Sequence, residues 1–342
     1  MFVDALIVDA AGTFPIAFGG RRETIVRNND LVHTFQGLAH RPVDWEASWW
    51  TTFGGKMIQS ALIPALLLCA TTTLAQTAAS APAGCGQLVS IETHDRTTTK
   101  YSLAGPAAAS TSGAPITLLL LIGGSGMIAL DDQACQHALS RNSLVRMRPA
   151  LHAVGIATAL VDVPSDISGT DGLAGLRVTS EHADDLGKII SDLRQRTKGT
   201  VWVVGHSRGS LSAANAAVRL SGLAAPDGVV LMSAMMSGEP RGKKAWTSQS
   251  VFDLPLEALK IPLLMIGHVA DNCPRSLASA MPRVIAKTQS SRPQEALING
   301  GPVPPGRAIN LSACEVGEPH DFVEQDAILA AGITRFVRGE KF

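Results

Sequence analysis

The chain has 342 residues, a formal net charge of zero and 46% hydrophobic residues. This length suits one large domain or two small ones, and the apolar content is sufficient to fill a core. A balanced charge gives no reason to expect nucleic acid or an anionic surface as a partner. The nine histidines show no metal-ligand spacing, and the glycine motifs that bind nucleotide phosphates do not occur.

The first 56 residues show no clear periodic element apart from one short apolar run within residues 4–10. We interpret residues 1–56 as an N-terminal extension outside the folded domain, with translation starting at Met57. A poorly ordered N-terminal arm is the alternative interpretation.

Residues 57–75 predict an export signal. Their apolar run has the length of a signal-peptide core and is too short for a comfortable membrane span, and Thr73 and Ala75 are the small residues that precede a cleavage site. Residues 76–84 then form a flexible mature start. We therefore expect a periplasmic or secreted protein without stable membrane insertion.

Residues 85–342 predict one α/β domain. Apolar or β-branched strands alternate with helical segments, which is typical of a doubly wound, mostly parallel sheet whose functional groups lie at the carboxyl ends of the strands. Strands are expected at 88–93, 97–103, 116–122, 156–163, 201–204, 228–234, 261–267 and 295–299, the first two as an antiparallel pair. Helices are expected at 131–154, 181–196 with Ser180 as N-cap, 210–220 and 321–337.

A tight turn at residues 205–209 is the most informative motif. It reads Gly-His-Ser-Arg-Gly, follows a buried strand and precedes a helix rich in small residues. This is the strand, turn and helix context of a nucleophile elbow, in which Ser207 is held in a strained conformation at the positive end of a helix. An ordinary serine in a strand-to-helix turn is the alternative.

Residues 85–342 resemble the α/β-hydrolase family. The resemblance is carried by this elbow and by the Gly-Gly-Ser-Gly turn at residues 123–126. It implies an α/β-hydrolase fold and hydrolysis of an ester, thioester or similar acyl bond through an acyl-enzyme, with no metal and no organic cofactor. The family's turn often begins with His, whereas Ile122 stands here, so lipase-type details do not carry over.

The family's chain order of nucleophile, acid and base identifies candidates for the remaining catalytic groups. His320, in the loop before the last helix, is the predicted base in preference to His268. Asp271, shortly after the strand at 261–267, is the predicted orienting acid, in preference to Asp253 in a connecting loop. Asp321 is expected to cap the last helix.

The cysteines test this assignment. If Asp271 touches His320, then Cys273 and Cys314 come close enough for a disulfide, the alternative being two buried thiols. Cys85 and Cys135 form a second pair by elimination. Pairing of all four suits an exported protein.

Two backbone N–H groups should stabilise the oxyanion. Arg208, directly after the nucleophile, supplies one, and Gly124 or Ser125 supplies the other. The Arg208 side chain either attracts an anionic substrate or is a solvated or salt-bridged group, and we favour the latter.

The connection at 235–260, here called the flap, is too short for a large cap domain, and a glycine-rich loop at 166–179 is a second candidate for movement. We expect a small-molecule acyl substrate. Peptidase, thioesterase or lactonase chemistry on the same triad remains open, as does a non-catalytic binding protein with this fold.

Overall fold

The computed structural model describes residues 6–8, 85–106, 114–239, 241–303, 306 and 308–342. The expected export signal, the mature start and all of the first 56 residues except Leu6–Val8 lie outside this part of the chain. Within the described residues no helix is long and apolar enough to cross a bilayer.

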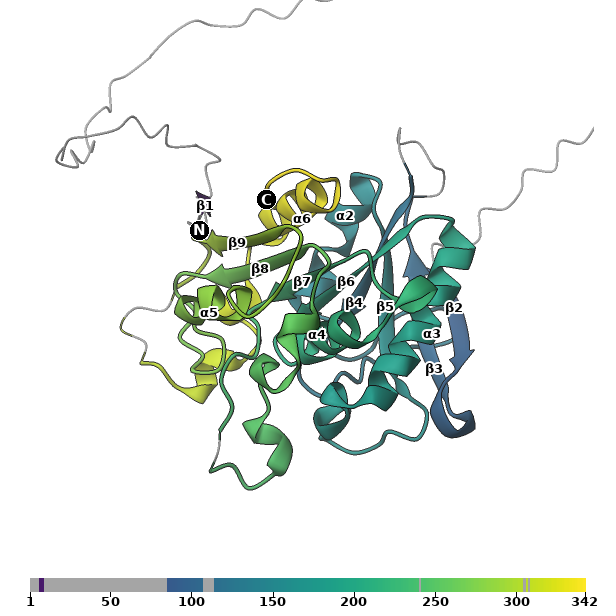
Figure 1. Ribbon diagram of the computed structural model, residues 1–342, viewed down its shortest axis with the longest axis horizontal. Coiled ribbons are helices and arrows are strands. Elements are labelled where there is room, and N and C mark those ends of the chain that lie inside the picture. The colour runs from purple at the N-terminus through teal and green to yellow at the C-terminus, as the bar shows by residue number, and fades with distance from the viewer. Residues whose placement is uncertain (1–5, 9–84, 107–113, 240, 304–305, 307) are drawn as a thin grey trace, which may run out of the picture. The chain divides into compact units, whose positions relative to one another are not determined.

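Within the described residues the strands form one nine-stranded sheet at the centre of the fold, with the strand order β1-β9-β8-β7-β6-β4-β5-β3-β2 (Figure 1). Pairing is parallel from β1 to β5 along this order, and β3 and β2 continue the sheet in antiparallel fashion. The predicted doubly wound, mostly parallel sheet is confirmed. The strands are β1 (Leu6–Val8), β2 (Gln87–Glu92), β3 (Thr98–Ala104), β4 (Ile116–Leu121), β5 (Ala157–Pro164), β6 (Thr200–His206), β7 (Gly228–Met232), β8 (Leu263–His268) and β9 (Pro293–Ile298).

Helices cover both faces of the sheet because the central strands are apolar on both. In β4, Leu119 and Leu121 pack on one face, and Leu118 and Leu120 on the other. The first face is covered by α3 (Ser180–Thr197), α4 (Gly209–Arg219) and α5 (Met281–Ile285), on the viewer's side in Figure 1. The second is covered by α1 (Ser143–Arg146), α2 (Arg148–Ala153) and α6 (Asp326–Val337).

Three local expectations were wrong. Residues 131–142 are not helical, because the Asp131 side chain accepts hydrogen bonds from the N–H groups of Gln133 and Cys135 and so competes with a helix. Thr179, rather than Ser180, caps α3 by accepting from the His182 N–H. The last helix starts at Asp326, and residues 319–321 form a separate 3-10 turn.

The N-terminal segment contributes one strand to the sheet. Leu6–Val8, which the expected domain boundary places outside the folded domain, pairs in parallel with Ala296 to Ile298 of β9. The boundaries at residues 56, 75 and 84 remain predictions.

Candidate active site

Ser207 lies on the sharp turn between β6 and α4, with φ +52°. Its N–H donates to the carbonyl of Met232, at the end of the neighbouring strand β7. A Cβ atom on Gly205 would lie 2.4 Å from the Gly209 carbonyl oxygen, and one on Gly209 would lie 1.8 Å from the Leu121 carbonyl oxygen. Only glycine therefore fits on either side, and the serine is held in a conformation that ordinary turns avoid.

The three side chains expected to form a triad lie in one hydrogen-bonded line. Ser207 Oγ is 3.0 Å from His320 Nε2, and His320 Nδ1 is 3.0 Å from Asp271 Oδ2. Both Asp271 and His320 are buried, whereas Ser207 is partly exposed. With the ring proton on Nδ1, His320 can accept the proton of Ser207 while the buried carboxylate stabilises the imidazolium that results.

The rival residues are engaged elsewhere. His268 Nε2 donates to the Gly300 carbonyl, and its Nδ1 accepts from the Ala270 N–H. The Asp253 carboxylate accepts from the Ser250 N–H in a local capping box. Neither therefore contacts Ser207.

Ser276 is a member of the site that no sequence motif singles out. Its hydroxyl donates to Asp271 Oδ2 at 2.7 Å and lies 2.9 Å from His320 Nδ1, so that it can accept from that ring nitrogen. It is almost fully buried. The Nδ1 proton is thus shared between a carboxylate and a hydroxyl, which fixes the rotation of the imidazole.

The backbone of His320 is held from the elbow itself. His206, the residue before the nucleophile, donates from Nε2 to the His320 carbonyl at 3.0 Å, and the Ser233 hydroxyl donates to the same oxygen at 2.8 Å. Asn142 Nδ2 lies 2.9 Å from His206 Nδ1 and can donate to it, because that ring nitrogen carries no proton when Nε2 is the donor. Burial lowers the pKa of His206, which keeps the ring neutral and suits one donating and one accepting nitrogen.

Asp321 does not cap the last helix, contrary to expectation. Its two carboxylate oxygens accept from the Ser143 N–H at 3.0 Å and from Arg146 Nη1 at 2.8 Å. These contacts tie the loop that carries His320 to α1, so Asp321 stabilises the position of the base from the far side of the sheet.

Two disulfides occur in the described residues, Cys273–Cys314 and Cys85–Cys135. The first closes the loop between the acid and the base, as expected from their convergence. Asp271, Cys273 and His320 offer ligand atoms within 4.8 Å of one another. Because the Cys273 sulfur is bonded to Cys314, it provides no thiolate, and the cluster is fully explained by the triad and the disulfide.

The turn after β4 lies directly against the nucleophile. A Cβ on Gly123 would be 2.8 Å from that of Ser207. Among the described residues, the N–H groups of Gly124, Ser125 and Arg208 donate to no other group. These are the three donors expected from the sequence, and their role in stabilising an oxyanion stays a prediction.

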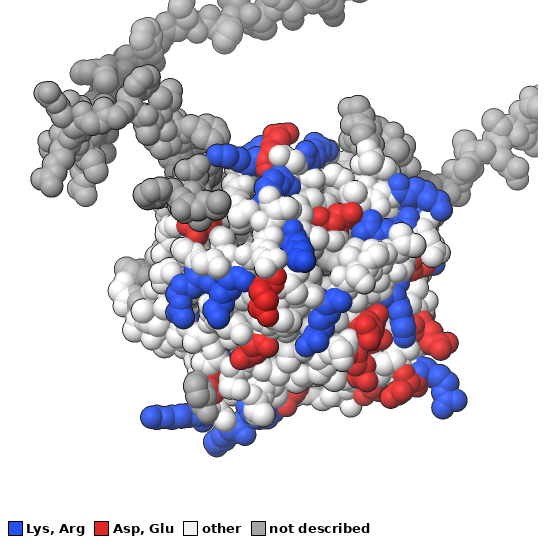
Figure 2. All heavy atoms as spheres, in the orientation of Figure 1, with Lys and Arg blue, Asp and Glu red and all other residues white. Residues whose placement is uncertain are grey.

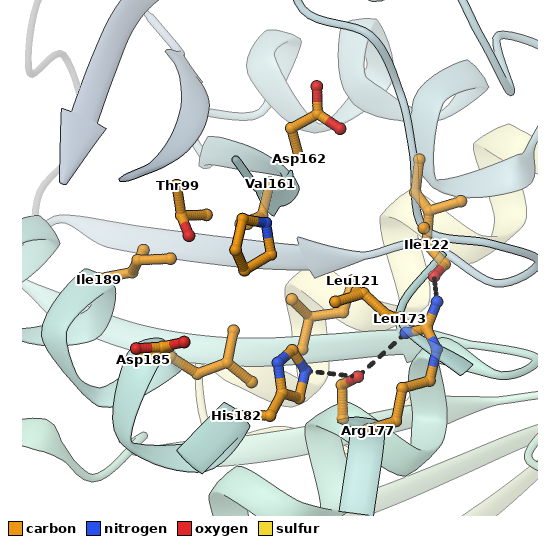
Figure 3. Close-up of a pocket in the computed structure, with 14 residues that line it drawn as sticks. Thr99, Leu121, Ile122, Val161, Asp162, Leu173, Arg177, His182, Asp185 and Ile189 are labelled. Atoms are coloured by element: carbon orange, nitrogen blue, oxygen red, sulfur yellow. Dashed lines mark hydrogen bonds between the residues drawn. The ribbon is translucent and has the colours of Figure 1, made fainter. Parts of the chain in front are cut away.

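A buried arginine supports this turn. Arg177 Nη2 donates to the Ile122 carbonyl at 3.0 Å and Nη1 donates to Ser212 Oγ at 3.0 Å (Figure 3). Nη2 also donates to the Gly124 carbonyl at 3.3 Å. Burial lowers its pKa to about 9. The guanidinium and His182 line a small cavity of about 20 Å³ whose lining does not include Ser207. We assign Arg177 a positioning role, which sequence reasoning missed.

The tip of the flap, residues 237–249, is linked to the loop at 166–179. Lys244 Nζ contacts both carboxylate oxygens of Asp171, at 2.6 and 2.5 Å. Trp246 lies beneath the guanidinium of Arg208, whose Cζ is 4.0 Å from the ring centroid. Both segments that the sequence marked as movable therefore meet beside the nucleophile.

Comparison with known proteins extends the fold assignment. No family model matches the chain, and no curated protein matches it. Among solved structures, esterase 2 from Thermogutta terrifontis is similar over 75% of this chain and 96% of its own, with 12% sequence identity and a TM-score of 0.50. The chain has the α/β-hydrolase fold.

Other structures with this fold are similar to a lesser degree. They include an α/β serine hydrolase without lid from Xanthomonas campestris, with 16% identity over 75% of this chain and 95% of its own and a TM-score of 0.47. Est1E from Butyrivibrio proteoclasticus has 14% identity over 74% and 98% and a TM-score of 0.46.

Proposed function

We propose that this protein is a serine hydrolase that cleaves an ester or related acyl bond through an acyl-enzyme. The observation that carries the proposal is the unbroken line from Ser207 Oγ through the His320 ring to Asp271, with 3.0 Å at each step. A strained φ at the serine and free N–H groups beside it support the same conclusion.

The geometry assigns each step to a group. Ser207 Oγ attacks the substrate carbonyl carbon as its proton passes to His320 Nε2. The N–H of Arg208 and that of Gly124 or Ser125 stabilise the oxyanion. His320 then protonates the leaving group, which departs and leaves the acyl group on Ser207. Water then gives a proton to His320 and attacks the acyl carbon. As the bond from the acyl carbon to Ser207 Oγ breaks, His320 returns the proton to Oγ, which releases the acid and the free serine.

Labelling with a fluorophosphonate probe, followed by peptide mapping, tests this function. We expect one labelled peptide that contains Ser207, and loss of labelling in both Ser207→Ala and His320→Ala. A Ser290→Ala variant, which removes a serine hydroxyl bonded to the Ile261 carbonyl, serves as the matched control and should label normally. A folded wild-type protein that does not label would instead support a non-catalytic binding role.

A substrate panel then separates the remaining chemistries. p-Nitrophenyl esters, acyl thioesters, lactones and aminoacyl amides should be compared by kcat/KM. We expect the oxygen esters to be cleaved best, and a clear preference for amides or lactones would reassign the reaction while keeping the triad.

We further propose that the protein is exported. The two disulfides in the described residues fit an oxidising compartment, in agreement with the predicted signal at 57–75. Mass spectrometry of the mature N-terminus should find Gln76, so that the exported protein would lack β1 at the edge of the sheet beside β9. A mature chain that retains residues 1–56 would contradict the proposal.

A further inference from the structure

The side chain of Arg208 is exceptional among the cations near the nucleophile. Lys244 is paired with Asp171, and Arg275 Nη2 contacts Glu239 at 2.7 Å. Within the described residues, no carboxylate lies within 4.0 Å of the Arg208 guanidinium. The salt-bridged alternative for this side chain is therefore not what the structure shows, because the group is partly buried and its nearest electrostatic compensation, from Asp171, is not a direct ion pair.

The position of the Arg208 guanidinium is defined nevertheless. It stacks on Trp246, with Cζ 4.0 Å from the ring centroid, and Nη1 lies 3.4 Å from the Gly124 carbonyl oxygen. The stacked face and one weak, long hydrogen bond leave the other N–H donors of the planar fork available. A guanidinium held flat in this way binds a carboxylate through two parallel hydrogen bonds with little further ordering.

The surroundings add positive charge. Burial lowers the pKa of Arg208, and the nearby charge of Arg275 lowers it further, whereas Asp171 opposes this effect. The flap tip carries Arg241, Lys243 and Lys244 against the single acid Glu239. Basic side chains accordingly gather at the lower edge of Figure 2, where the green loop after β7 lies in Figure 1.

A groove lies beside the flap tip. It has a volume of about 390 Å³ and is lined by Glu239 and Arg241 of the flap tip and by Pro274 and Arg275, the two residues that separate Cys273 from Ser276. Arg275 pairs with Glu239, so Arg241 leaves one positive charge in excess in the lining.

We propose that the acyl substrate carries a carboxylate a few atoms from the bond that is cleaved, and that the Arg208 side chain binds it. This inference rests on the proposed hydrolase function and names its substrate class. Arg208 then acts twice, through its N–H on the oxyanion and through its side chain on the anionic end of the substrate.

A pair of substrates of equal length tests the proposal. The p-nitrophenyl esters of valerate and of glutarate, the latter as the half-ester, differ by a terminal methyl or carboxylate. After subtraction of spontaneous hydrolysis, we expect wild-type kcat/KM to favour the glutarate half-ester about tenfold, the effect of one charge-assisted hydrogen-bonded pair in a partly exposed site. A wild-type enzyme that favours valerate would overturn the proposal.

The ratio of the two kcat/KM values is the readout in every variant, because it cancels a general loss of activity. Arg208→Met should reduce the ratio about tenfold, and Arg208→Lys should retain part of the preference. Lys243→Met removes a charge from an exposed position of the flap tip and is the matched control, with less than a twofold change expected. An unchanged ratio in Arg208→Met, or an equal fall in the control, would contradict a specific carboxylate site.

Binding gives a second readout that does not depend on turnover. In the Ser207→Ala variant, the monomethyl ester of glutarate, which keeps one carboxylate, but not the uncharged methyl ester of valerate should raise the melting temperature by about 2 °C or more at saturation, and Arg208→Met should abolish the shift. If this shift occurs but no ester is cleaved, binding of a carboxylate by Arg208 is supported and the proposed hydrolase function is wrong. If esters are cleaved without any dependence on Arg208, the hydrolase function stands and the substrate class is wrong.

Discussion

Two segments lie on either side of the nucleophile, namely the base loop and the flap tip. They are held in different ways. The base loop, residues 317–325, has buried anchors: the His320 carbonyl accepts from His206 and Ser233, and Asp321 is bonded to α1. The flap tip is held by two ion pairs, Lys244 with Asp171 and Arg275 with Glu239, and by partly buried hydrogen bonds such as that from Arg275 Nη1 to the Thr247 carbonyl.

The two kinds of contact differ in strength. Exposed ion pairs contribute about 0 to 1 kcal/mol, whereas removing a partner from a buried polar group costs about 1 to 3 kcal/mol. The proton-transfer chain must keep its geometry in every turnover, and a segment that contacts substrate can gain from small movements. We infer that the base loop fixes the chemistry and the flap tip adapts to the substrate.

Removal of the Cys273–Cys314 disulfide should give the largest effect. The double variant Cys273→Ser/Cys314→Ser should lose about 4 kcal/mol of unfolding free energy for this loop length, measured by urea denaturation, and kcat should also fall because Asp271 and His320 are no longer linked.

The other disulfide is the matched control for this experiment. Cys85→Ser/Cys135→Ser opens a loop of similar length, with a sequence separation of 50 rather than 41. Its stability loss should be comparable and its kcat closer to wild type. Equal losses of kcat in the two folded double variants would show that the Cys273–Cys314 disulfide has no special role in holding Asp271 and His320 together.

Ser276→Ala should lower kcat about tenfold with a smaller change in KM, because the bond to Asp271 is of the charge-assisted kind and orients the imidazole. Steady-state kinetics on a p-nitrophenyl ester measures both constants. A rise in KM alone would instead place Ser276 in substrate binding.

His206 predicts a dependence of stability on pH. Since burial lowers its pKa, the unfolded chain takes up a proton below pH 6.5 that the folded protein does not, and the unfolding free energy should fall as the pH decreases from 6.5 to 5. The slope from one such histidine is at most about 1.4 kcal/mol per pH unit.

The variant His206→Gln should therefore show a shallower decline in urea denaturation across this range. Part of the decline should remain, because burial also lowers the pKa of His182 to about 3 and that of His152 to about 4. Parallel curves for wild type and variant would show that His206 is not protonated on unfolding in this range.

Lys244→Met should have the smallest effect. Loss of an exposed ion pair should change the unfolding free energy by less than about 0.5 kcal/mol and KM by up to about threefold, while limited proteolysis at the flap tip becomes faster. A stability loss comparable with that of the disulfide variant would mean that the flap tip is anchored as firmly as the base loop.

The sequence was sufficient to predict those parts of the site that are marked by a pattern within a few neighbouring residues. Ser207 is marked by glycines two residues away on either side, and the strands by continuous apolar runs. The order in the chain then singled out Asp271 and His320, and the structure places both in one line with Ser207. The disulfide between Cys273 and Cys314 followed from the same convergence.

What the sequence could not supply are contacts between polar residues far apart in the chain. Ser276 meets His320 across 44 positions, and Arg146 meets Asp321 across 175. No periodicity or motif distinguishes these residues from ordinary surface groups. The non-helical stretch at 131–142 was missed for a related reason. The Asp131 carboxylate accepts hydrogen bonds from nearby backbone N–H groups, which prevents a helix even though the residues favour one.

The sequence by itself thus determined the layered sheet and the strained turn and singled out candidates for the nucleophile, acid and base, because apolar patterning and glycine requirements act over a few residues. Only the tertiary structure decided how the His320 loop is held and, within the part of the chain that it describes, that no carboxylate pairs directly with the Arg208 guanidinium. Those outcomes depend on which loops pack against one another, and packing is a property of the whole domain.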